Sequence, residues 1–78
     1  MIQEHDCIVL NVDLPEEGLK QGDVGTVVMI HRGGEGYEVE FMTLDGETLT
    51  VVTLLSSQVR PIGHREIANA RPVEIASR

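Results

Sequence analysis

Two side chains near the start of the chain, His5 and Cys7, are of the types that bind soft metal ions. Residues two apart on a strand point to the same side, so the imidazole and the thiol could share one ion. Two ligands leave a site incomplete, because structural zinc takes four protein ligands and catalytic zinc three, so His31 or His64 would have to complete it. We therefore expect no metal and no cofactor, and we interpret Cys7 as a small buried thiol beside a surface histidine.

Motifs for covalent or phosphate chemistry are also incomplete. A nucleophilic thiol at Cys7 would need a base and an electropositive setting, whereas Glu4 and Asp6 flank it. The run GGEG at 33–36 lacks the spacing of a phosphate-binding loop and leads into a strand-like segment instead of a helix. No G-x-S-x-G motif surrounds the serines at 56–57. The sequence therefore predicts a protein that is not an enzyme.

Carboxylates occur in two close pairs, Glu16 with Glu17 and Glu38 with Glu40. Acid–base catalysis needs a carboxylate in a dry pocket, but Glu38 and Glu40 alternate with apolar residues and fall on the wet face of a strand. Glu16 and Glu17 lie in a polar loop. The simplest interpretation is a solvated surface. The functional alternative is a surface that attracts a basic protein, with Glu16, Glu17, Glu38 and Glu40 as its partner-binding residues.

The charge distribution disfavours nucleic acid as a partner. The net charge is −7: residues 1–62 carry 3 basic and 11 acidic side chains (3 − 11 = −8), and residues 63–78 carry 3 and 2 (3 − 2 = +1). An acidic body repels a polyanion, because nucleic-acid affinity comes largely from neutralising phosphates with Lys and Arg. One tyrosine and one phenylalanine also make a poor platform for stacking bases.

The length and the single cysteine bound the class of protein. A chain of 78 residues is enough for one domain with a thin stability margin. One cysteine excludes an intrachain disulfide and is typical of a reducing compartment. The start of the chain lacks a signal-peptide pattern, and no apolar run approaches the ~20 residues that cross a bilayer. We expect a cytoplasmic protein with no membrane contact, and self-association into a homo-oligomer stays open.

Short strands must position these side chains. Period-two patterns and turn residues predict strands over 7–12, 24–32, 37–42, 48–55 and 59–62, with a loop at 13–23, turns at 33–36 and 45–46, and a 3₁₀ turn at 56–58. The order of a long loop, two hairpins and a 3₁₀ turn is that of an SH3-like barrel. An OB-type barrel needs a helix where this chain has only TLDGE. We predict an all-β, five-stranded antiparallel SH3-like barrel over 1–62 and a C-terminal tail over 63–78.

Single residues refine this prediction. Gly25 inside a strand predicts a bulge or a close approach of two backbones. Tyr37 and Phe41 share the inner face of their strand with Val39. Pro61 places the last strand at an edge of the sheet. In the tail, residues 64–70 could form one or two helical turns, and Leu14 and Leu19 should pin the long loop to the barrel.

Three stretches together resemble the small bacterial proteins grouped as domain of unknown function 4926: DLPEEGLKQGDVGTVV, YEVEF and DGETLTVVTLLSSQVRPI. The resemblance implies an SH3-like module with no known activity, and it implies companions such as larger enzymes or toxin–antitoxin partners. QGDVGTVV is also similar to the turn of KOW-type barrels. Those domains are basic and bind RNA, so their function does not transfer to this acidic chain.

Composition and motifs together favour a non-catalytic protein-interaction or adaptor module. It would dock on a larger protein, or on itself, through a strand edge or the acidic first loop. One alternative is an accessory subunit of an enzyme, or a barrel that binds a small ligand or metal. Another is a regulatory partner of the toxin–antitoxin type.

Overall fold

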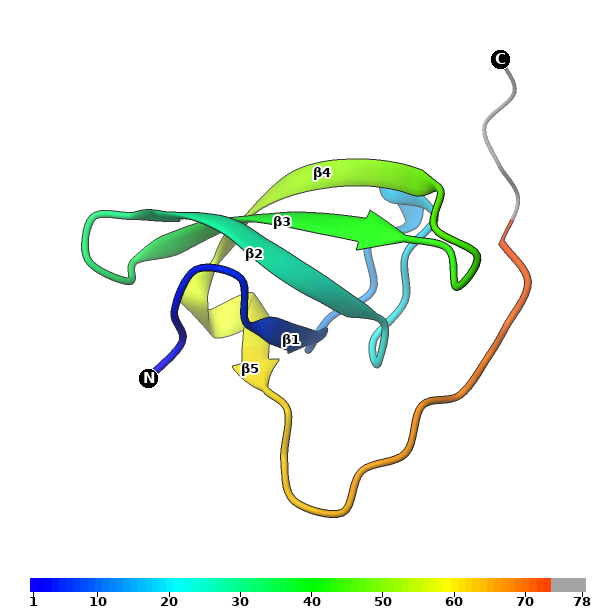
Figure 1. Ribbon diagram of the computed structural model, residues 1–78. Helices are drawn as coiled ribbons and strands as arrows, with labels where there is room; N and C mark the ends of the chain where they lie inside the picture. Colours follow the sequence, from blue (N-terminus) through cyan, green and yellow to red (C-terminus); the bar gives the residue numbers. More distant parts are fainter. Residues whose placement is uncertain (74–78) are drawn as a thin grey trace.

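Five antiparallel strands form one sheet in the order β4-β3-β2-β1-β5 (Figure 1). The computed structural model describes residues 1–73. The elements are β1 (Cys7–Leu10), η1 (Pro15–Glu17), β2 (Val24–His31), β3 (Gly36–Met42), β4 (Thr48–Leu55), η2 (Ser56–Gln58) and β5 (Val59–Pro61). The prediction of an all-β, five-stranded antiparallel fold is confirmed, and η2 is the 3₁₀ turn expected at 56–58.

The sheet curls around an aliphatic and aromatic core. Figure 1 shows β1 and β5 on one side and β2, β3 and β4 on the other, while β4 and β5 end the sheet without pairing with each other. Tyr37, Val39 and Phe41 are buried from β3, as their alternation predicts. The rest of the core cluster is Ile8, Leu10, Leu19, Val27, Leu54 and Val59.

Gly25 of β2 lies tightly against β3 on the inner side of the sheet. A Cβ atom at this position would lie 2.6 Å from Cγ1 of Val39 and 3.0 Å from the backbone oxygen of Glu40. The close approach predicted from the glycine is therefore confirmed. It lets β2 bend over the core, and a register shift between Val27 and Met29 follows in the same strand.

The long first loop is held by its two leucines, as predicted. Leu14 and Leu19 form an isolated antiparallel bridge, and Leu19 is 3% exposed within the core cluster. Gly18 makes the sharp turn between them in the left-handed region, at φ 73°. The loop therefore has a defined path beside the start of β2.

Two local expectations are wrong or only partly met. Cys7 is exposed, whereas a small buried thiol was expected. It opens β1, and burial begins only at the next residue, Ile8, where the strand enters the core. The strand also ends at Leu10 and not at 12.

The tail forms no helix over 63–73, so the helical turns considered for 64–70 are not formed. Arg65 has φ 64°, which no right-handed helix accommodates. The Glu66 carboxylate instead accepts the backbone N–H of Gly63 and pairs with Arg60 at 2.7 Å. The remainder of the predicted tail, 74–78, lies outside the described residues. Within the described part of the chain, no helix is long and apolar enough to span a bilayer.

Candidate functional site

Two of the predicted partner-binding carboxylates hold the edge strand β4 from the outer face of β3. Glu38 and Glu40 are half-buried and alternate with the core residues of β3. Glu38 Oε2 accepts a hydrogen bond from Thr53 Oγ1 at 2.6 Å, and Glu40 Oε2 accepts one from Thr48 Oγ1 at 2.6 Å. Each carboxylate is thus fixed by a threonine hydroxyl of β4.

A third predicted carboxylate reaches the same strand from the first loop. Glu17 ends η1, and its Oε1 accepts a hydrogen bond from Thr50 Oγ1 at 3.1 Å, although the residues are 33 positions apart. Thr50 faces Phe41 in the ladder, so this contact lies on the opposite side of β4 from Glu38. Glu16 is exposed beside Glu17. The structure therefore gathers three of the four predicted glutamates around one strand.

The ionisation of Glu38 is set by its hydrogen bonds. The Thr53 hydroxyl, and after it the His31 imidazole at 2.8 Å, lowers the pKa of this carboxyl below its ordinary 4.5. A lowered pKa keeps Glu38 negative at neutral pH. A general acid would need the opposite shift, so this carboxylate suits attraction of a cation and not proton donation.

Exposed apolar side chains lie among these carboxylates. Val51 is 53% exposed and Leu55 is 63% exposed, both on the outer face of β4. The register pairs Glu38 with Met29 on one side and with Thr53 on the other, and it pairs Glu40 with Val51. We call Glu17, Glu38, Glu40, Val51 and Leu55 the β4 surface; it extends around the edge of the strand, with Glu17 on the opposite side of β4 from the other four residues. It combines fixed negative charge with exposed apolar area.

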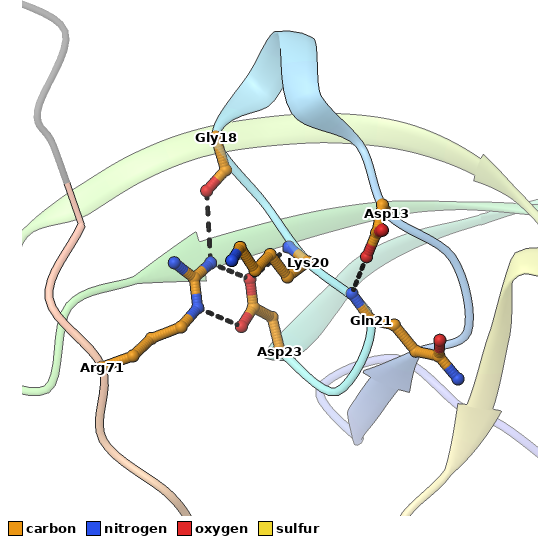
Figure 2. A network of polar contacts seen from close by, with 6 residues as sticks. All are labelled: Asp13, Gly18, Lys20, Gln21, Asp23 and Arg71. Carbon is orange, nitrogen blue, oxygen red and sulfur yellow. Dashed lines mark hydrogen bonds and ion pairs between the residues drawn. The ribbon is translucent and has the colours of Figure 1, made fainter.

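A second polar cluster fastens the tail to the first loop (Figure 2). Arg71 Nε donates to Asp23 Oδ1 at 3.0 Å, and its Nη2 donates to Asp23 Oδ2 and, at 3.2 Å, to the Gly18 carbonyl. Asp23 Oδ2 also accepts the backbone N–H of Lys20 at 2.8 Å. This ion pair raises the pKa of Arg71. Arg71 and Asp23 both line a cavity of about 440 Å³ between the tail and the sheet.

Sequence reasoning missed the pair Arg71–Asp23 because the two residues are 48 positions apart. The cavity beside the pair is lined mainly by apolar side chains, among them Leu19, Phe41, Met42 and Leu49. The sequence places Asp23 only at the end of the loop predicted over 13–23. No local pattern in the tail marks Arg71 as different from Arg65, which is exposed.

The histidines and the cysteine do not come together. His5 lies in a turn with φ 75° before β1, Cys7 is exposed at the start of that strand, and His31 is engaged with Glu38. Over residues 1–73, no group of three or more His, Cys, Asp or Glu side chains could hold a metal ion. The pair His5 and Cys7 therefore gains no further ligand from the fold.

Fold and site together define a small all-β domain that carries an acidic and apolar surface on an edge strand. The chain belongs to the family described as Domain of unknown function (DUF4926), whose model matches residues 4–61. The match spans all five strands, the first loop and the three carboxylates of the β4 surface. No curated protein matches the chain significantly. No solved structure does so either.

Proposed function

We propose that this protein is a non-catalytic interaction module of the cytoplasm that docks on another protein through the β4 surface. The observation that carries the proposal is the fixing of three carboxylates by three threonines of one edge strand. Carboxylates held in place lose less conformational freedom on binding than free surface side chains do. The neighbouring Val51 and Leu55 supply apolar area to be buried by a partner.

The charge of the surface indicates a basic protein as the partner. Strands β3 and β4 contain no lysine or arginine, so the carboxylates Glu38 and Glu40 have no cationic neighbour on their own strands. A positive surface on the partner would speed association and favour the correct docking orientation. Nucleic acid would be repelled by the same carboxylates.

Affinity capture at low salt, from an extract of the organism that encodes the protein, tests the proposal. The bait is compared with Glu40→Lys and with Glu4→Lys, which changes the net charge equally at an exposed residue outside the β4 surface. We expect a partner that the unchanged protein and Glu4→Lys retain and that Glu40→Lys loses. Equal retention by both variants, or no partner for the unchanged protein, would refute the proposal.

A further inference from the structure

We propose that the free edge of β4 binds an extended, lysine- or arginine-bearing segment of the partner as an additional β-strand. The inference rests on the proposed function and gives its mode of binding and the chemistry of its partner. It commits to backbone pairing with β4, which docking through side chains alone would not require.

The first argument is the direction of the backbone groups. The N–H of Ser56 donates to the Glu35 carbonyl at 3.1 Å, on the β3 side. Because N–H groups alternate along an antiparallel strand, those of Leu55, Thr53 and Val51 point to the free side. Gln58 Oε1 accepts the N–H of Leu55 at 2.8 Å, as this alternation requires.

The free groups of Val51 and Thr53 therefore form a short pairing site. No other backbone segment within residues 1–73 pairs with this side of β4. The two residues are separated by one position, which is the spacing at which a neighbouring strand places its own donors and acceptors. Gln58 closes the site at its Leu55 end.

The second argument is the contrast between the two edges of the sheet. The edge strand β5 has only three residues and contains Arg60 and Pro61, which are features that prevent strand addition. The edge strand β4 has eight residues, TLTVVTLL, with no charge and no proline. One edge of this sheet is protected against pairing and the other is not.

The third argument is charge, which selects the occupant. An added strand projects alternate side chains to both faces of the sheet. Glu38 and Glu40 lie on the outer face beside β4, and Glu17 is bonded to β4 from the opposite side. A second copy of this chain would bring the same carboxylates against each other at a net charge of −7 each. A basic segment meets a carboxylate on either face, so it is the favoured occupant.

A blocked synthetic peptide of alternating lysine and valine residues probes the edge directly, with a glutamate–valine peptide as its charge control. Binding is followed by amide chemical shifts and hydrogen exchange of the protein. We expect the lysine peptide to slow the exchange of the Val51 and Thr53 amides and the glutamate peptide to leave them unchanged. Slower exchange that grows with protein concentration, without peptide, would assign the edge to a second copy and overturn the inference.

Val51→Pro separates strand addition from simple charge attraction. The N–H of Val51 points away from β3. Proline at this position therefore removes a donor from the free edge, while the hydrogen bonds between β3 and β4 are all kept. Val51→Ala retains the N–H and loses a similar amount of side chain. We expect the Kd for the lysine peptide to rise about fivefold or more in Val51→Pro relative to Val51→Ala, from the lost hydrogen bond. Equal affinity of the two folded variants would overturn the inference.

The two proposals fail in different ways. Loss of the captured partner in Glu40→Lys but retention in Val51→Pro would keep the interaction function and reject strand addition. If the unchanged protein captures no partner, the function itself fails, whatever the peptide does.

Discussion

Glu38 of β3 and Thr53 of β4 face each other across the two strands, and their side chains are joined by a hydrogen bond of 2.6 Å. The same carboxylate oxygen also lies 2.8 Å from His31 Nε2 on β2. One residue of β3 thereby links its two neighbouring strands on the solvent side. The link stabilises the ionised form of Glu38, and this has a measurable consequence for the pH dependence of folding.

Acid should weaken the fold partly through Glu38. Its folded-state pKa is lowered, so its contribution to stability is present above the unfolded pKa of about 4.3 and is lost as the pH falls through the folded value. Thermal unfolding measured between about pH 7 and about pH 3 should therefore give a shallower loss of Tm for Glu38→Gln than for the unchanged protein. The exposed Glu4→Gln serves as the control and should keep the original slope. If Tm falls equally with decreasing pH in the unchanged protein and in Glu38→Gln, this role of Glu38 is contradicted.

The Glu66 carboxyl, in the turn at the start of the tail, should titrate at an unusually low pH. Its pKa falls to about 2, first because of the hydrogen bonds from Arg60 and then because of the Gly63 backbone N–H. Replacement of Arg60 by glutamine should raise this midpoint toward the ordinary 4.5, as followed by NMR of the side-chain carboxyl carbon. Arg65→Gln, which makes the same charge change nearby, should leave the midpoint low. A midpoint near 4.5 in the unchanged protein would show that the pair does not persist in solution.

Gly25→Ala should destabilise the fold. The added Cβ would lie 2.6 Å from Val39 Cγ1 and 2.9 Å from Phe41 Cε2, both in the buried core. Overpacking of this kind costs about 1–3 kcal/mol, measured as the free energy of unfolding in urea. Gly36→Ala is the matched strand control. A Cβ atom at Gly36 would lie no closer than 3.3 Å to another heavy atom, the Leu54 carbonyl oxygen, so we expect a smaller loss of stability. A loss at Gly36 that equals or exceeds the one at Gly25 would be inconsistent with the close approach of β2 and β3.

Arg71→Gln should release the tail while the five-stranded sheet stays folded. The variant loses the pair with Asp23 and the bond to the Gly18 carbonyl, whereas the Asp23 contact with the Lys20 N–H remains. A partly exposed ion pair contributes at most about 1 kcal/mol, so we expect a small change in Tm. Limited proteolysis within 64–70 should become faster, as it should in the unchanged protein at high salt. The control Arg65→Gln should be cleaved at the rate of the unchanged protein. If Arg71→Gln is cleaved no faster than this control, Arg71 does not fasten the tail to the first loop.

The positions of the strands and of their buried faces follow largely from local patterns in the sequence. The alternation of Tyr37, Val39 and Phe41 with glutamates determined both faces of β3, because successive side chains of a strand point to opposite sides. Glycine-rich and Asp-Gly turns determined where the hairpins lie, and the alternation placed Glu38 and Glu40 on the outer face of β3. Cys7 was misjudged because burial at the first residue of a strand depends on what lies across from it.

The gathering of these parts was decided by the tertiary structure alone. Glu17 meets Thr50 and Asp23 meets Arg71 over separations of 33 and 48 residues, and no local pattern encodes such distances. Pro61 predicts that β5 is an edge strand, but the position of β4 at the other edge is non-local, since it depends on β5 pairing with β1 and not with β4. The sequence by itself determined the strands and their wet and dry faces through short-range periodicity. The fold decided that three carboxylates surround one free edge, because only long-range pairing brings separate segments to the same strand.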